Sequence, residues 1–291
     1  MFLTKITIVC FFGSYVVTLL LDVTRLLFRA PIRIAVMWTF AVAGLFAHSV
    51  YLWLRVQEEL PSASPLSNWH DWCLLIAWTL TATYLLIGVW RPESAAGMFI
   101  LPLVLILIGL AYIYRDAPSF PREQALTVWG VVHGIALLLG TIVVALGFVA
   151  GVMYLIQSYR LKHKLPPSEG IKLPSLEWLQ KENERALVIS SVLLGVGLLS
   201  GIVLNLIRSN VVAWSDPVVW SSGVLFLWLA TVLTFNFIYK PARRGRKVAY
   251  LVVASFLFFA LELGIVLFAQ HATPPSSPNV STVNAVTGGE S

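Results

Sequence analysis

Long, uninterrupted apolar blocks are the feature that most limits what this chain can fold into. Each approaches the ~20 residues that a helix needs to cross the hydrocarbon of a bilayer. The blocks are residues 6–22, 34–54, 72–90, 96–114, 126–156, 186–207, 218–239 and 247–269. None alternates with the period of two that a membrane β-barrel requires. The sequence therefore predicts an all-α fold, a polytopic integral membrane helical bundle with about eight transmembrane helices.

Composition agrees with a chain that lies in lipid. Of the 291 residues, 58% are hydrophobic and 12% charged, whereas about a quarter of an ordinary soluble domain is charged. The net charge of +6 comes from basic residues in loops between the blocks, so the lipid bilayer is the expected partner and nucleic acid is not. We predict one transmembrane domain over residues 1–269, with an uncleaved first helix, and a disordered polar tail over residues 270–291.

Basic residues predict how the chain is oriented. The loops that follow the first, third, fifth and seventh blocks hold 15 Lys and Arg, and the other face, with both termini, holds 5. Because positively charged loops stay in the cytoplasm, both termini are predicted outside. In the 157–185 loop, Pro174-Ser175 indicates the start of a helix that lies along the membrane surface and runs into the sixth block, with a solvated linker as the alternative. Cys10 and Cys73 are read as small buried hydrophobes.

Small residues predict a close helix pair. The motifs Gly147-x-x-x-Gly151 and Gly197-x-x-x-Gly201 lie in the fifth and sixth blocks. Glycines at this spacing let two backbones approach closely. We therefore expect the fifth and sixth helices to pack against each other, although this says nothing specific about function.

Two histidines inside the apolar blocks are the main candidates for chemistry. His48 lies in the second block and His133 in the fifth, and a rise of ~1.5 Å per residue puts both in the outer part of the ~30 Å core. Imidazoles can coordinate haem iron, so we expect the two rings to point toward one another's helices across an aromatic-lined cavity. The alternative is two separate histidines, each bonded to nearby backbone or water.

Several other polar and aromatic residues have both a structural and a functional interpretation. Trp129 lies one turn before His133 and fits either a haem platform or the aromatic belt of a membrane protein. Asp216 precedes Pro217 and is typical of a helix cap. Glu262 is either a proton-handling group or a satisfied structural carboxyl. His70 and His271, predicted in outer loops, are either further axial ligands or solvated side chains.

Four stretches of the sequence stand out together: "AGLFAHSVYLWLR" with His48, "VVHGIALLLGTIVVALGFVAGVMYLIQSYRLKHKLPPSE" with His133, "LPSLEWLQKENERALVISSVLLGVGLLSG", and "RRGRKVAY" before the last block. In these stretches, and in their order and spacing, the chain resembles the CcsA-related, HemX-like branch of the cytochrome c assembly protein family. The resemblance extends over residues 34–269. It implies a multi-pass protein of the cell inner (plasma) membrane that binds or passes haem beside other cytochrome c biogenesis proteins.

The resemblance also implies which residues act. His48 and His133 match the histidines of the family's second and fifth crossings and would bind haem iron. In place of the family's larger outer tryptophan-rich motif stands only "WSDPVVW", with Trp214 and Asp216, and His271 could add a ligand. We expect an assembly or scaffold protein with no catalytic residues rather than an enzyme. The alternatives are a small-solute secondary transporter that uses Glu262 and a structural subunit without haem.

Overall fold

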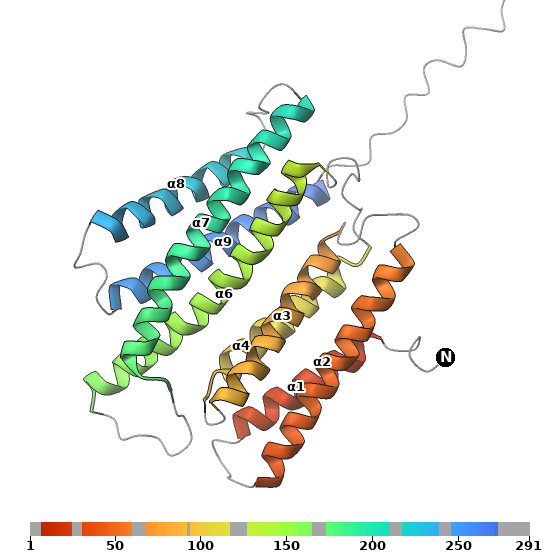
Figure 1. Ribbon diagram of the computed structural model, residues 1–291, viewed down its shortest axis with the longest axis vertical. Helices are drawn as coiled ribbons and strands as arrows, with labels where there is room; N and C mark the ends of the chain where they lie inside the picture. The colour runs from red at the N-terminus through yellow and green to blue at the C-terminus, as the bar shows by residue number, and fades with distance from the viewer. Residues whose placement is uncertain are drawn as a thin grey trace, which may run out of the picture.

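The structure is a bundle of helices. The computed structural model describes residues 7–24, 31–59, 68–91, 94–116, 127–164, 173–209, 217–238 and 246–272. The helices are α1 (Ile8–Thr24), α2 (Pro31–Glu59), α3 (Trp69–Trp90), α4 (Gly97–Ile113), α6 (Val128–Lys162), α7 (Leu176–Ser209), α8 (Pro217–Ile238) and α9 (Arg246–Ala272). Figure 1 shows successive helices running in opposite directions along the bundle. The predicted all-α membrane fold is confirmed.

The helices are long and apolar enough for a membrane. Within the described ranges, six of them (α2, α3, α6, α7, α8 and α9) satisfy both the length and the composition of a membrane span. The remaining two, α1 and α4, are apolar helices of 17 residues each, near the lower limit of ~17 for a crossing. Large apolar side chains such as Leu227 and Leu261 are more than 60% exposed on the outside of the bundle. Such a surface suits lipid rather than water.

Two helix boundaries differ from the prediction. The α3 helix begins at Trp69 because the Asn68 side chain accepts a hydrogen bond from the Asp71 N–H at 2.9 Å, which caps the helix. The helix predicted after Pro174 is the first part of α7, and it runs into the sixth apolar block without a break to Ser209, as predicted. The last helix reaches Ala272, beyond the predicted end at residue 269, and the rest of the predicted tail, residues 273–291, lies outside the described residues.

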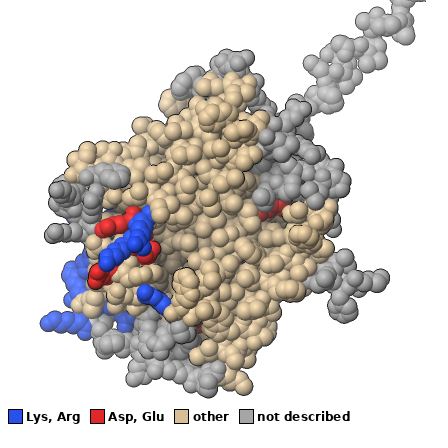
Figure 2. All heavy atoms as spheres, viewed as in Figure 1, with Lys and Arg blue, Asp and Glu red and all other residues tan. Residues whose placement is uncertain are grey.

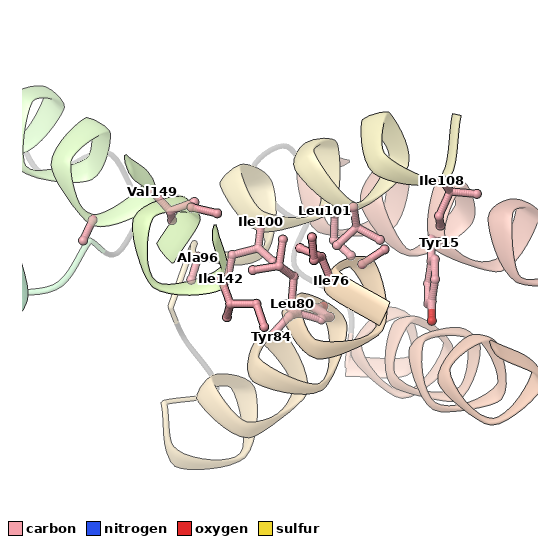
Figure 3. Close-up of a cluster of buried hydrophobic side chains, with 14 of the residues drawn as sticks. Tyr15, Ile76, Leu80, Tyr84, Ala96, Ile100, Leu101, Ile108, Ile142 and Val149 are labelled. Atoms are coloured by element: carbon pink, nitrogen blue, oxygen red, sulfur yellow. The ribbon is translucent and has the colours of Figure 1, made fainter. Parts of the chain in front are cut away.

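The largest hydrophobic cluster joins the two halves of the bundle. Figure 3 shows Ile100 and Leu101 of α4 beside Leu80 of α3, between Tyr15 of α1 and Ile142 of α6. All but Ile142 of these side chains are fully buried, and Ile142 nearly so. The pair α3 and α4 therefore connects α1 and α2 to α6. Of the two cysteines, Cys73 is buried in this cluster, as predicted, but Cys10 is exposed on α1, which the prediction had wrong.

Glycines bring α6 and α7 into the most extensive contact of any two helices. A Cβ atom on Gly197 would lie 2.5 Å from Leu137 Cδ2 of α6, and one on Gly147 would lie 2.9 Å from Ala186 Cβ of α7. The predicted close packing of these two helices is confirmed. Gly151 differs in part, because its nearest neighbours are Val253 and Ala249 of α9.

Positive charge collects at one end of the bundle, where α6 ends and α7 and α9 begin. We call this the basic end. Figure 2 shows that the blue side chains in this view gather there, together with red ones, on a face that is otherwise mostly uncharged. The Arg91 guanidinium lies 4.7 Å from the centre of the Trp178 ring, which places the end of α3 here as well. Nine Lys and Arg of the described ranges belong to this end: Arg33, Arg91, Arg160, Lys162, Lys164, Lys181, Arg185, Arg246 and Lys247. Of the Lys and Arg residues at the opposite end, only Arg55 and Arg115 have described side chains.

The glycine contacts predict how α7 responds to larger residues. Gly197→Val should lower the free energy of unfolding by about 1–3 kcal/mol, because the added methyl groups overlap Leu137 of a packed neighbour. Gly195→Val is the matched control, since a Cβ at Gly195 meets nothing within 4 Å. Thermal unfolding in detergent measures the difference, and an equal loss in both variants would contradict the assigned helix faces.

Candidate functional site

His48 is a completely buried imidazole between α1 and α2. Its ring stacks on the Phe11 ring, with centroids 4.3 Å apart and planes within 2° of parallel. Its Nδ1 lies 3.3 Å from the hydroxyl of Tyr15, whereas its Nε2 has no hydrogen-bond partner among the described residues. A buried ring nitrogen without a partner is costly in an apolar surrounding. His48 therefore carries one nitrogen whose hydrogen-bonding capacity the described side chains leave unused.

The aromatic neighbours of His48 continue to a second histidine. Phe11 also contacts Tyr51, one turn after His48, with ring centroids 5.6 Å apart. The Tyr51 hydroxyl lies 3.2 Å from Nε2 of His70. The structure thus brings His48 and His70 into one cluster, which we call the aromatic cluster and which consists of Phe11, Tyr15, His48, Tyr51 and His70. Sequence reasoning missed this cluster, because His70 was assigned to a loop.

His70 is buried in the first turn of α3, so the prediction of a solvated loop histidine was wrong. Its Nδ1 lies 2.8 Å from the carbonyl oxygen of Ala111 at the end of α4, and its Nε2 forms a hydrogen bond with the Tyr51 hydroxyl. The neighbouring Asp71 forms an ion pair with Arg55 at 2.6 Å. Because both ring nitrogens have partners, His70 connects the ends of α2, α3 and α4 and offers no free nitrogen to a metal.

His133 faces α7. Its Nδ1 lies 2.7 Å from the carbonyl oxygen of Gly197, which is close enough for the ring N–H to donate to that carbonyl. A Cβ on Gly201 would lie 2.9 Å from His133 Cε1, so this glycine leaves the space that the imidazole fills. The same two glycines that bring the helices together therefore also hold the ring.

The expectation that His48 and His133 point toward one another's helices is not met. The ring of His48 stacks on α1, and the ring of His133 bonds to α7. Figure 1 shows why, because α3 and α4 lie between α2 and α6. Depth estimated from sequence gives the height of a residue along its helix and not the direction in which the side chain points.

Tryptophans beside His133 occupy different surroundings. Trp129 is 45% exposed on the outside of α6, as expected for an aromatic belt. Trp72 of α3 packs against the other side of this helix, where its ring would lie 3.3 Å from a Cβ on Gly134. Trp214 and Asp216 lie outside the described residues, and at His271 only the helical backbone is described.

Glu262 has a partner of its own. Its Oε1 accepts a hydrogen bond from the Ser222 hydroxyl of α8 at 2.7 Å, and the side chain is buried. This bond joins α9 to the start of α8. The geometry favours the satisfied structural carboxyl over the proton-handling group.

The donor atoms suit haem iron better than a bare metal ion. Within the described ranges, no group of three or more His, Cys, Asp or Glu could hold a metal ion. Haem supplies four ligands from its porphyrin and needs only one or two from the protein. A ligating histidine commonly donates its other ring N–H to a carbonyl, and His133 has that arrangement. The residues present therefore fit haem in their chemistry, although His48 is tightly enclosed by the aromatic cluster.

Comparison with protein families gives a match over most of the chain. The family described as Cytochrome C assembly protein matches residues 66–271. The chain belongs to the cytochrome c assembly protein family. The match contains His70 and His133, whereas His48 precedes its first residue. Comparisons with curated proteins and with solved structures give no significant match.

The hydrogen bond between Tyr51 and the buried His70 predicts a stability effect. Tyr51→Phe should lower the free energy of unfolding by about 1 kcal/mol, because His70 Nε2 is left without a partner inside the cluster. Tyr112→Phe, on the exposed surface of α4, is the control and should change little. Thermal unfolding in detergent compares the two, and equal melting temperatures would argue against a bond that contributes to the fold.

Proposed function

We propose that this protein handles haem in the membrane during cytochrome c assembly. The observation that carries the proposal is family membership over residues 66–271. The apolar bundle supports it, because haem is a largely apolar macrocycle that a lipid-embedded protein can hold or pass. Bound haem would supply an iron that accepts axial nitrogen ligands. The expected partners are haem and other membrane proteins of cytochrome c biogenesis.

His133 and His48 are the proposed axial ligands. In both rings Nδ1 has a partner within the bundle. Nε2 of His48 has none among the described residues, and the described hydrogen bond of His133 is made by Nδ1 and not by Nε2. A fixed Nδ1 orients the ring, and a free Nε2 is the atom that would reach iron. Because the two rings face different helices, a single haem between them would require rearrangement. Two separate haem sites, one at each histidine, would require less rearrangement.

We also propose that the chain belongs to the HemX-like branch of the family. Trp129, Trp214, Asp216 and His271 would then line the outer approach to haem, in keeping with the family resemblance. The reduced tryptophan motif favours haem supply or scaffolding over presentation of haem on a broad platform.

The transporter alternative has less support. It needs a carboxylate available for coupling, and Glu262 is engaged by Ser222. A structural subunit without haem remains the second candidate, because the closed packing around His48 would suit it equally well.

Hemin titration of the purified protein tests histidine ligation. We expect His133→Ala and His48→Ala to remove Soret absorbance of bound low-spin haem, because each deletes an axial nitrogen. Loss of the whole signal in each variant fits one shared haem, and loss of about half in each fits two sites. His163→Ala, at the basic end, is the matched histidine control. Unchanged spectra in both variants would exclude these two ligands.

Orientation is proposed from the distribution of charge, with the basic end in the cytoplasm of a cell whose inner (plasma) membrane contains the bundle. In a variant without Cys10 and Cys73, a membrane-impermeant thiol reagent added from outside should label Asp116→Cys and not Lys164→Cys. These two positions lie at opposite ends of the bundle and are both exposed. Labelling of Lys164→Cys alone would reverse the orientation.

A further inference from the structure

A pocket opens at the basic end, between the last turns of α6 and the first turn of α9. It has a volume of about 450 Å³. Its lining residues are Leu155, Ile156, Tyr159, Lys162, His163, Arg246 and Tyr250. We call it the α6–α9 pocket. It lies at the other end of α6 from His133, so it is distinct from the candidate haem ligands.

The lining combines cationic and apolar groups. Lys162 and Arg246 bring positive charge, and Leu155 and Ile156 bring an apolar wall. Arg246 is held in place because its guanidinium donates to the hydroxyl and to the backbone carbonyl of Ser158. A guanidinium has five N–H donors, so several remain for a ligand. The pocket thus presents an oriented cation rather than a freely moving one.

No carboxylate among the described residues neutralises these cations. The ion pairs of α7 at this end, Lys181 with Glu177 and Arg185 with Glu182, use side chains outside the pocket. The described contacts of Arg246 are with Ser158. An uncompensated pair of cations beside an apolar wall attracts an anion that also carries apolar groups.

The length of α6 places the pocket at the membrane surface. This helix has 35 residues, whereas about 20 cross the hydrocarbon core. With His133 in the core, the turn that carries Tyr159 and Lys162 emerges among the lipid headgroups. Tyr159 and Tyr250 are each about 60% exposed, which is typical of tyrosines at an interface.

We propose that the α6–α9 pocket binds the phosphate of an acidic membrane lipid. Arg246 and Lys162 contact the phosphate oxygens, His163 and the tyrosine hydroxyls supply further hydrogen-bonding groups, and the acyl chains lie along Leu155 and Ile156. A free phosphate would use only the polar half of the lining. Occupation by a lipid joins α6 to α9 through a shared anion, in addition to the bond between Arg246 and Ser158. The proposal does not depend on haem binding.

Native mass spectrometry of the full-length protein in detergent tests this site. With phosphatidylglycerol and phosphatidylcholine as probes, we expect preferential binding of phosphatidylglycerol. Lys162→Gln and Arg246→Gln should each lower its affinity about fivefold, as expected for the loss of one cation near an acidic headgroup. Arg185→Gln removes the same charge from the exposed surface of α7 at this end and should leave the affinity unchanged.

Further measurements keep the result interpretable. Lys162 has no described side-chain contact, so its variant tests binding without disturbing α6 against α9, and Arg246→Lys should retain most of the affinity. Equal binding of the two lipids, or an equal loss in Arg185→Gln, would overturn the site. Displacement of phosphatidylglycerol by millimolar inorganic phosphate would show that the pocket binds a soluble anion, and it would contradict the proposed lipid site.

Discussion

The absence of hydrogen-bond partners in hydrocarbon is the constraint on which this structure depends. Helices satisfy their own backbone groups, but a buried polar side chain still needs a partner, on its own helix or on a neighbouring one. The pairs formed by His133 with Gly197, His70 with Tyr51 and Glu262 with Ser222 meet that demand. Each also joins two helices, so the polar residues help to set the arrangement that glycine packing permits.

Much of the fold follows from sequence, because apolar length and glycine spacing depend on local periodicity. The helices, and the contact of α6 with α7 through Gly147 and Gly197, were predictable for that reason. The start of α3 was predicted too late, since a hydropathy pattern does not register the cap at Asn68. That error of one turn moved His70 from the buried cluster into a loop.

The candidate site was less accessible to sequence reasoning. The depths of His48 and His133 follow from helix geometry, whereas the directions of their rings depend on which helices are neighbours. Packing of α3 and α4 between α2 and α6 separates the two residues, and neither hydropathy nor glycine spacing reveals that order. The contacts of Phe11 and Tyr15 with His48 could not be predicted without knowing where α1 lies. Family membership supplies the haem proposal independently of these contacts.

The proposed function requires haem to reach His48 and His133 in the native membrane. The most direct measurement is the absorption spectrum of the wild-type protein purified from haem-replete cells, before and after dithionite. We predict a Soret band that shifts on reduction and sharp bands of a low-spin haem with nitrogen ligands. A colourless protein that is intact, folded and obtained from cells with ample haem would contradict stable ligation and leave a scaffold without bound haem.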